Sequence, residues 1–309
     1  MTPPKVTIVL PVYNAAATID ATIRSVLDQS MTQFELFAID DGSSDDSLHR
    51  LLDHATHDER IRVVARDNHG VSASRNLGAA MGSAPLVAFL DADDLWAPDK
   101  LERHVAAHET DPALAASYAR IAFIAQQADG LHGARTLSSL SQGPLRLMDV
   151  LGENPVCTAS NMVVRRDWLD RTGGFDEQLS FAEDQDLVAR IVHDGGRVDG
   201  IDAVLTGYRF SPCGLSMDLE RMYAGWRTVA ARYLGSGELA PLEALYCRYL
   251  SRRVLRGGGR PQLARHYALT GLRRDAASFL TQWRRGASTL IAAFASPVIP
   301  APLRLRLFA

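Results

Sequence analysis

The sequence has 309 residues, of which 47% are hydrophobic and 22% are charged, the composition of an ordinary soluble globular protein. The net charge of −3 conceals an asymmetry: residues 1–214 carry 18 basic and 31 acidic side chains, whereas residues 215–309 carry 15 arginines, no lysine and 5 acids. Three distant cysteines (Cys157, Cys213 and Cys247) argue against a disulfide framework and a cysteine-based metal site, and the N-terminus lacks the pattern of a signal peptide. We therefore expect a protein of a reducing, cytoplasmic compartment, with two regions that have different partners.

Strands and helices are predicted to alternate through the first 110 residues. Short apolar runs that stop at polar or turn residues predict buried strands at 6–10, 34–39, 61–65 and 86–90. Apolar residues at helical spacing predict a helix after each of the first two strands, a third at 71–81 and a fourth that begins at Pro98. Ser43 and Asp46 have nearly the spacing of a capping box. The alternation predicts an α/β fold with a largely parallel sheet, in which ligands bind at the carboxyl ends of the strands.

The pattern is less regular after residue 112. We expect strands at 115–125 and 156–164, a loop at 126–142, helices at 166–171 and 182–193, and a hairpin or strand pair at 198–210. Four helices are predicted near 217–234, 239–256, 261–275 and 277–294. The chain is therefore expected to form an α/β domain over 1–214 and a basic helical region over 215–309. Three prolines interrupt the uncharged stretch 286–303, so no membrane-spanning helix is expected.

Three predicted strands deliver polar residues to one edge of the sheet. The strand at 86–90 ends in Asp91, Asp93 and Asp94, and carboxylates this close repel one another unless a metal ion or another cation compensates them. Taken alone, this cluster is better explained as a solvated turn with a helix cap. Two earlier strands, however, end in Tyr13-Asn14 and Asp40-Asp41, which makes a shared binding crevice the better interpretation.

Five motifs make the sequence similar to a known family. They are PVYN at 11–14, DDGSSDDS at 40–47, NHGVSASRNLG at 68–78, FLDADD at 89–94, and GGFDE followed by AEDQDL within 173–187. In this order they resemble the motifs of family 2 inverting glycosyltransferases. The resemblance covers about residues 1–210 and implies a GT-A fold, a nucleotide-binding α/β domain with a mixed sheet.

The resemblance assigns donor-binding roles to Pro11, Tyr13, Asp41, Arg75 and Asp91. Tyr13 would stack on the base, and Asp41 would accept a hydrogen bond from it, which favours UDP as the nucleotide. Arg75 would lie near the diphosphate or the ribose, and Asp91 near the ribose.

The same resemblance assigns the metal and the chemistry. Asp93 would bind Mn²⁺ or Mg²⁺, which are held by oxygen ligands and substrate phosphates, and Asp94 is expected to cap the next helix. Asp184 would be the catalytic base that deprotonates an acceptor hydroxyl, with Glu183 orienting the acceptor or its loop. Acids at 183–186 also suit the positive end of a helix dipole without any catalytic role.

One part of the family pattern is missing. Many relatives carry a histidine after the last strand that helps to bind the metal. Here the region reads Tyr208-Arg209-Phe210-Ser211-Pro212-Cys213-Gly214, without a histidine. Either Asp93 and the donor phosphates suffice, or another group takes its place.

Two other classes of protein remain as alternatives. A nucleotidyltransferase that makes sugar nucleotides should have a glycine-rich phosphate loop with a lysine, which residues 11–17 lack. A receiver-type signalling domain would use the paired Asp40 and Asp41, but it would be shorter and would not explain the acids at 183–186. The leading hypothesis is transfer of a sugar to a glycan or lipid-linked acceptor, in cell-envelope or exopolysaccharide biosynthesis.

The basic C-terminal region has two readings. In the first, its arginines solvate the outer face of a helical appendage or mediate oligomerisation. In the second, they attach residues 248–309 to an anionic membrane surface, on the inner face of the cell membrane. Nucleic acid is not expected as a partner, because the recognition motifs and interleaved aromatic residues are absent from the sequence.

Overall fold

The computed structural model describes residues 2–132, 134, 136–209, 217–256, 259–299 and 303. The chain divides into two compact units. The first comprises Met1–Leu147 and Pro155–Arg209, and the second comprises Met148–Asn154 and Phe210–Ala309. The boundary expected at residue 214 stays a prediction, because residues 210–216 lie outside the described residues.

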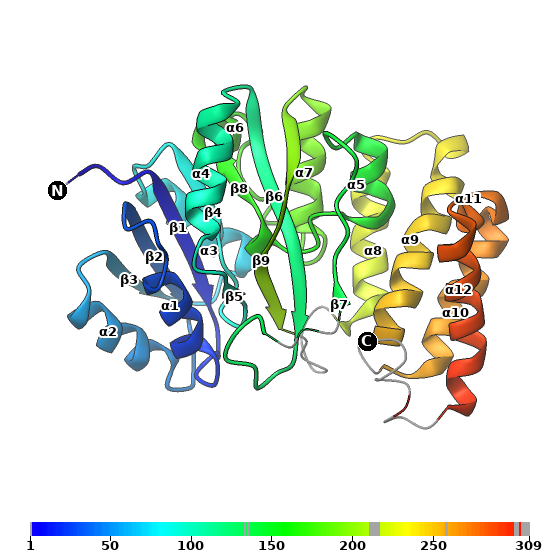
Figure 1. The fold of residues 1–309 in the computed structure, drawn as a ribbon, viewed down its shortest axis with the longest axis horizontal. Helices are drawn as coiled ribbons and strands as arrows, with labels where there is room; N and C mark the ends of the chain where they lie inside the picture. The colour runs from blue at the N-terminus through cyan, green and yellow to red at the C-terminus, as the bar shows by residue number, and fades with distance from the viewer. Residues whose placement is uncertain are drawn as a thin grey trace. The chain divides into compact units, whose positions relative to one another are not determined.

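The first unit is built on one mixed sheet (Figure 1). Its strands run in the order β3-β2-β1-β4-β8-β6-β9-β5, with β7 paired to β6. Pairs β1–β2, β2–β3, β1–β4 and β6–β9 are parallel, and β8, β5 and β7 pair antiparallel. The strand bounds are β1 Val6–Val12, β2 Phe34–Asp41, β3 Ile61–Arg66, β4 Leu86–Phe89, β5 Leu95–Trp96, β6 Leu114–Ile124, β7 Thr136–Leu137, β8 Val163–Arg165 and β9 Arg197–Arg209. The expected α/β fold with a mixed, mostly parallel sheet is confirmed.

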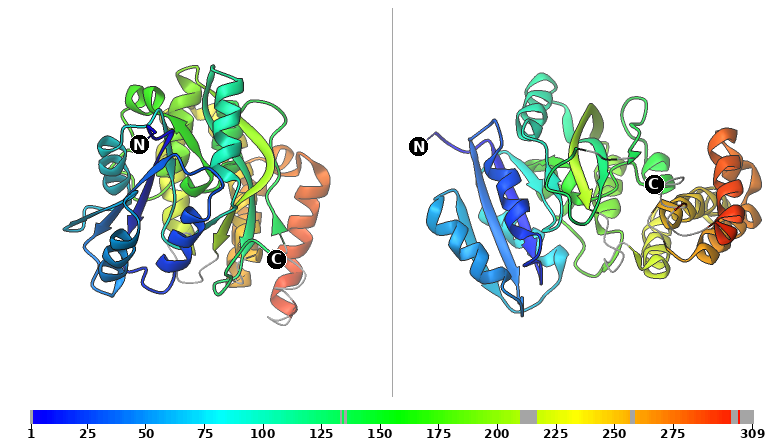
Figure 2. Two further views of the ribbon diagram at one scale, coloured as in Figure 1. Left: turned by 60° about the vertical axis from the view of Figure 1, so that its left-hand side comes forward. Right: turned by 60° about the horizontal axis from the view of Figure 1, so that its bottom comes forward.

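Helices cover both faces of this sheet, as Figures 1 and 2 show. Side chains of a strand alternate between faces, so Ile8 and Leu10 of β1 join a core with Ile19 and Ile23 of α1. Val9 faces the other way, where Gly78 of α3 lies so close that an added Cβ would be 2.4 Å from Val9 Cγ1. The helices of this unit are α1 Ile19–Leu27, α2 Ser47–His57, α3 Val71–Met81, α4 Lys100–Thr110, α6 Arg166–Thr172 and α7 Glu183–His193.

Parallel pairing brings the carboxyl ends of β1, β2 and β4 to one edge of the sheet. The polar residues that follow these strands therefore share that edge, as predicted. Pro11 does not end the first strand, which continues to Val12 with Pro11 in register with Ile39. Proline is accommodated there because the pairing with β4 stops at Val9, so β4 has no ladder position opposite Pro11.

Three local predictions were wrong. Residues 156–164 are not a strand: Thr158 accepts the Ser160 N–H and begins a 3₁₀ helix over Ala159–Asn161, and only Val163–Arg165 form β8. The described residues of 198–210, up to Arg209, form no hairpin but belong to one long strand, β9, which keeps its pairing with β6 through register shifts. The capping box also fails, because α2 begins at Ser47 and Asp46 makes no side-chain cap.

The second unit is helical and has an aromatic core. Trp226 stacks on Tyr246 with ring centroids 4.8 Å apart, and its indole N–H donates to the Leu151 carbonyl at 2.6 Å. The last predicted helix is two helices, α11 and α12. The elements are α5 Leu147–Glu153, α8 Leu219–Ala230, α9 Ser236–Arg256, α10 Pro261–Arg274, α11 Ala276–Leu280, α12 Trp283–Ala295 and the 3₁₀ helix η3 Ser296–Val298. No helix in the described part of the chain is long and apolar enough to cross a membrane.

Candidate active site

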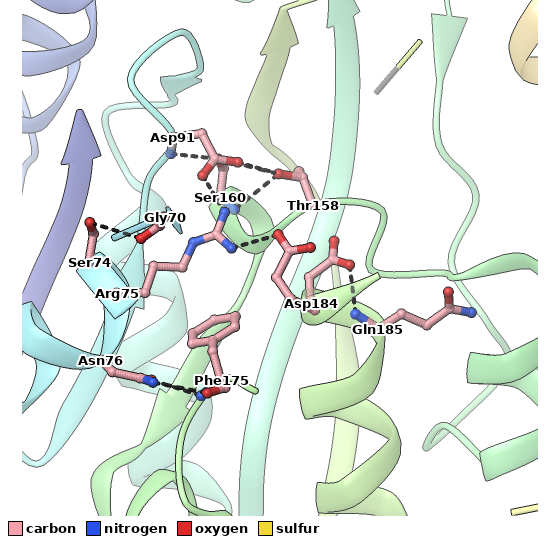
Figure 3. Close-up of polar contacts among 11 residues, drawn as sticks. Gly70, Ser74, Arg75, Asn76, Asp91, Thr158, Ser160, Phe175, Asp184 and Gln185 are labelled. Carbon is pink, nitrogen blue, oxygen red and sulfur yellow. Dashed lines mark hydrogen bonds and ion pairs between the residues drawn. The ribbon is translucent and has the colours of Figure 1, made fainter. Parts of the chain in front are cut away.

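Arg75 joins two of the predicted site regions. Its Nη2 lies 2.6 Å from Asp91 Oδ1 (Figure 3). Its Nη1 lies 2.8 Å from Glu183 Oε1. The Arg75 side chain is only 4% exposed, so both ion pairs are largely shielded from water. One buried cation from α3 thus holds the loop after β4 against the first residue of α7.

Asp91 is fixed by two residues that the sequence did not single out. Thr158 Oγ1 donates to Asp91 Oδ2 at 3.0 Å, and the Asp91 N–H donates to Ser160 Oγ at 2.9 Å. Both belong to the segment that was expected to be a strand. With the Arg75 ion pair, these contacts occupy both carboxylate oxygens of Asp91.

Asp93 and Asp94 stand in an acidic environment. Burial and the Asp91 charge raise the pKa of Asp93 to about 6, with Arg209 acting in the opposite direction. Burial, with the charges of Asp93 and Asp91, raises the pKa of Asp94 well above its ordinary value. The ionised forms of these carboxyls are therefore costly unless further positive charge arrives.

Asp94 does not cap the following helix, contrary to expectation. Helix α4 begins at Lys100, whereas Asp94 is 1% exposed and accepts the Arg209 N–H at 2.9 Å. Burial at the end of β9 explains the difference, because the carboxylate is used to satisfy a backbone donor of that strand.

Arg209 lies in the region, 208–214, where the resemblance led us to expect a histidine. Its Nε donates to the Asp93 carbonyl at 2.7 Å, and its Nη1 donates to the Ala128 carbonyl at 2.8 Å. The guanidinium thus clamps the acidic loop to the loop after β6. Residues 210–214, the rest of the region that has no histidine, lie outside the described residues.

Asp184 is the second residue of α7. Its Oδ1 accepts the Gln185 N–H at 2.6 Å, and Ala182 before the helix has a left-handed φ of 63°. Burial and the neighbouring Glu183 raise the pKa of Asp184 to about 7, while Arg75 acts against them. In Figure 3, Asp184 lies beside the ion pairs that Arg75 forms. A carboxylate with this pKa is suited to accept a proton near neutral pH.

Tyr13, Asp40 and Asp41 lie at the carboxyl ends of β1 and β2, where the sequence predicts nucleotide binding. Tyr13 is 56% exposed beyond the end of β1, so it is not a core aromatic residue. Asp41 is buried and holds the following loop: Oδ1 accepts from Arg66 Nε at 2.9 Å, and Oδ2 accepts the Gly70 N–H at 2.7 Å. Asp40 Oδ1, by contrast, is buried without a hydrogen-bond partner among the described residues. Pro11 is buried within β1.

Asn76 ties two motifs together in a way that the sequence did not reveal. Its Nδ2 donates to the Phe175 carbonyl at 2.9 Å, and the Phe175 N–H donates to its Oδ1 at 2.8 Å (Figure 3). A side chain at Gly174 would meet Asn76 Oδ1 at 2.5 Å, and Gly174 has a φ of +73°, so glycine is required. The Arg75 guanidinium lies 5.0 Å from the Phe175 ring centroid, within cation–π range. The motifs were the only signal for these contacts.

The acidic loop fits a divalent cation. Carboxylate oxygens are the ligands that Mg²⁺ and Mn²⁺ prefer, and the raised pKa values of Asp93 and Asp94 show that their negative charge is incompletely compensated. In the part of the chain that the structure describes, no three His, Cys, Asp or Glu side chains converge as a metal-binding group. The residues therefore suit a cation that takes few ligands from the protein and others from a substrate.

A separate cavity of about 690 Å³ lies at the opposite edge of the sheet, near the start of β4. Four of its charged lining residues are already paired, with Lys5 2.7 Å from Glu109 and Arg165 2.7 Å from Asp167. None of the predicted site residues lines it.

Comparisons with known proteins agree with this geometry. Residues 7–173 match the model of "Glycosyl transferase family 2". The succinoglycan biosynthesis protein ExoU of Rhizobium meliloti (strain 1021) is 33% identical, over 74% of this chain and 70% of that protein. The chain is 39% identical to WfgD of Escherichia coli, a UDP-Glc:alpha-D-GlcNAc-diphosphoundecaprenol beta-1,3-glucosyltransferase, over 32% of this chain and 39% of WfgD. It spans only 27% of another relative, the chondroitin synthase of Escherichia coli.

The fold is also shared with a solved structure. S. aureus TarS 1–349 in complex with UDP-GlcNAc superposes with a TM-score of 0.61 at 17% identity, over 94% of this chain and 90% of that one. The match therefore extends into the helical second unit. Because the family model covers more than half of the chain and ExoU matches over most of its length, the chain belongs to glycosyl transferase family 2 and is a glycosyltransferase.

Proposed function

We propose that this enzyme transfers a sugar from a UDP-sugar, with inversion at the anomeric carbon, to a hydroxyl of a glycan or lipid-linked acceptor. The observation that carries the proposal is the Arg75 bridge. It joins Asp91, on the donor side, to Glu183, the neighbour of the proposed base Asp184. Polysaccharide or cell-envelope biosynthesis is the proposed setting, supported by the names of ExoU and WfgD.

The donor nucleotide would bind at the carboxyl ends of β1 and β2. The exposed ring of Tyr13 is free to stack on the base, and Asp41 Oδ2 retains acceptor capacity beyond its bond from Gly70. Asp91 would contact the ribose, and Arg75 would place its charge near the diphosphate. A uridine nucleotide is supported by the UDP-GlcNAc complex of TarS and by the donor in the name of WfgD.

Asp184 would act as the catalytic base. It removes the proton of the acceptor hydroxyl while that oxygen attacks the anomeric carbon, and the bond to the diphosphate breaks with its electron pair leaving on the diphosphate. The pKa of about 7 keeps Asp184 basic enough for this task and partly ionised at neutral pH. Glu183 stays paired with Arg75 and thereby fixes the start of α7.

Asp93 is the proposed metal ligand. When bound, Mn²⁺ or Mg²⁺ supplies positive charge that stabilises the departing nucleoside diphosphate. Metal dependence is typical of the family. The incomplete compensation of Asp93 in the protein alone supports this role.

The compartment is proposed to be cytoplasmic, peripheral to the inner face of the membrane. The cysteine pattern suits a reducing compartment, and Cys247 is a buried free thiol. A lipid-linked acceptor such as the one in the name of WfgD would bring the enzyme to a membrane surface.

The proposal is tested with Asp184→Asn. Transfer from UDP-sugars to a panel of glycan and lipid-linked acceptors should fall at least a thousandfold, while UDP affinity changes less than threefold. Asp194→Asn, at the exposed end of the same helix, is the matched control and should retain transfer. Full activity of Asp184→Asn would show that Asp184 is not the catalytic base. Pyrophosphate release from a sugar phosphate and a nucleoside triphosphate would indicate a nucleotidyltransferase instead.

A further inference from the structure

Helix α12 and the short η3 that follows it expose large apolar side chains in a row. Trp283 is 70% exposed, Ile291 69%, Phe294 49% and Val298 84%. Their separations of eight, three and four residues place them on one side of a helix. We call these four side chains the α12 face.

The opposite side of α12 is lined by small residues. Gly286, Thr289 and Ala293 are its buried positions. An added Cβ at Gly286 would lie 2.7 Å from the Phe279 carbonyl oxygen, so α12 packs closely against α11 there. A surface helix ordinarily turns its large apolar residues inward. Here the arrangement is reversed, so the α12 face is not required for packing within the unit.

Arginines border the α12 face. The Arg284 guanidinium lies 5.7 Å from the Trp283 ring centroid, and the Arg265 guanidinium lies 5.8 Å from that of Phe294. Within the described residues neither arginine forms an ion pair. The sequence from residue 276 to the end contains four arginines and no acid. The border of the apolar face is therefore positively charged without internal compensation.

The arginines of α9 do not contribute to this surface to the extent that the sequence predicts. Arg248 has a side chain only 3% exposed, with Nε 2.8 Å from Glu153 Oε1 and Nη1 donating to the Phe279 carbonyl at 2.8 Å. Arg253 is 7% exposed. Some of the arginines in 248–309 are thus buried and stabilise the helical unit. The candidate region for contact with a partner is therefore limited to α12 and the arginines that border it.

We propose that the α12 face docks on the surface of an anionic phospholipid bilayer. An exposed apolar stripe with a tryptophan at one end and arginines at its edge is the arrangement of a helix that lies in the membrane interface. The uncompensated arginines match the negative surface potential of anionic lipids, whereas a second copy of the same basic face would be repelled. With 13 residues, α12 is too short to span the bilayer, so it lies along the surface.

The full-length protein is tested by sedimentation with vesicles. Wild type should bind vesicles of phosphatidylcholine with 30% phosphatidylglycerol and bind pure phosphatidylcholine at least tenfold more weakly, with binding that falls as salt rises. The double variant Ile291→Ser/Phe294→Ser should lose at least tenfold in partitioning. Both positions are exposed, so the substitutions leave the core intact. Leu52→Ser/Met81→Ser, at exposed apolar positions 49% and 43% accessible in the first unit, is the matched control and should bind like wild type.

Two further measurements separate bilayer docking from other occupants. Fluorescence of Trp283 should shift to shorter wavelength with anionic vesicles, and Trp283→Phe should remove that shift. Analytical ultracentrifugation without vesicles should give the same mass for wild type and the double variant. Equal vesicle binding by the two proteins overturns the proposal. A wild-type dimer that the double variant dissociates also overturns it and assigns the α12 face to a second copy.

Discussion

Arg75 donates to Glu183 at 2.8 Å, although 108 positions separate the two residues in the sequence. Through its other nitrogen the same guanidinium binds Asp91, so the acidic loop after β4 and the first turn of α7 share one buried cation. The arrangement connects Asp91, the proposed donor-binding residue, to Glu183, the neighbour of the proposed base Asp184. Disturbing Arg75 should therefore affect stability and catalysis together.

Arg75→Met should leave Asp91 and Glu183 as uncompensated acids in a largely buried site. Removing one partner from such a network costs about 3–5 kcal/mol of unfolding free energy. We expect a loss of this size in urea titrations, and transfer activity below one hundredth of wild type. Arg62→Met is the control: Arg62 is 59% exposed and 3.6 Å from Glu35, so its removal should cost less than about 1 kcal/mol. Equal stability of Arg75→Met and wild type would contradict the proposed coupling.

The pH dependence of transfer should follow the ionisation of Asp184. Burial and the Glu183 charge raise its pKa to about 7, and only the ionised carboxylate accepts a proton. The kcat/KM should therefore fall as pH drops below 7, to about a tenth of its plateau at pH 6. Glu183→Gln removes one cause of the raised pKa and should move the profile to lower pH. A profile that Glu183→Gln leaves in place would mean that another group titrates.

Metal binding should depend on Asp93. Wild type should show a larger rise in Tm with UDP plus Mn²⁺ than with UDP alone, because a ligand of the folded state stabilises it. Asp93→Asn should abolish the additional rise in Tm that Mn²⁺ causes. EDTA should abolish the same rise in wild type. Asp99→Asn replaces an acid that is 42% exposed and paired with Arg103, and it should behave like wild type. A Mn²⁺ effect that survives in Asp93→Asn would place the metal ligand elsewhere.

The two acids at the end of β2 should differ in nucleotide binding. Asp41→Asn weakens the bonds from Arg66 and the Gly70 N–H, which should cost about 1–3 kcal/mol of stability and lower UDP affinity by at least tenfold. Asp40→Asn is the comparison, since Asp40 Oδ1 has no partner in the described part of the chain. Isothermal titration with UDP distinguishes them. If only Asp40→Asn lost UDP affinity, Asp40 and not Asp41 would be the residue that recognises the nucleotide base.

Local sequence patterns correctly predicted several strands and helices. The strand ends that carry Tyr13, Asp41 and Asp91 were predicted because each strand is a short apolar run, and parallel pairing then brings their ends to one edge. Helix α3 also has the predicted bounds, Val71–Met81, although most of its buried positions are small or polar residues. These elements depend on residues within one turn or one strand of each other.

The supporting contacts were not predictable in this way. Thr158 reaches Asp91 across 67 positions, and Asp94 reaches the Arg209 backbone across 115. Neither pair has a periodicity or a turn signal, since each bond depends on how the whole sheet brings distant segments together. Hence the sequence predicted Asp94 as a helix cap, although tertiary burial gives it a backbone donor of β9. The same limit applies to 156–164, where apolar character predicted a strand and polar contacts to Asp91 favour a turn.

Lys100 is a further residue that only the structure explains, and it permits a test of the core. Its ammonium is buried, 3.2 Å from His104 Nε2 and 3.3 Å from the Asn161 carbonyl, and it forms no ion pair within the described residues. Burial lowers its pKa to about 7. Because the unfolded chain has a lysine pKa near ~10.4, the folded state binds fewer protons between these values. Stability from this site is therefore lowest below pH 7 and rises as the pH increases towards 10.

Lys100→Met should remove the free-energy cost of burying a charged ammonium in the folded state. At pH 7 the variant should be more stable than wild type by about 1–4 kcal/mol, and the difference should shrink as the pH rises to 10. Urea unfolding of both proteins at pH 7, 8, 9 and 10 measures it, and groups common to the two proteins cancel in the difference. Lys5→Met, at a side chain 42% exposed and paired with Glu109, should give a difference under about 1 kcal/mol that does not vary over this range. A variant less stable than wild type at pH 7 would show instead that the charged ammonium contributes favourably to the core, through His104, the Asn161 carbonyl and the Trp96 ring 5.2 Å away.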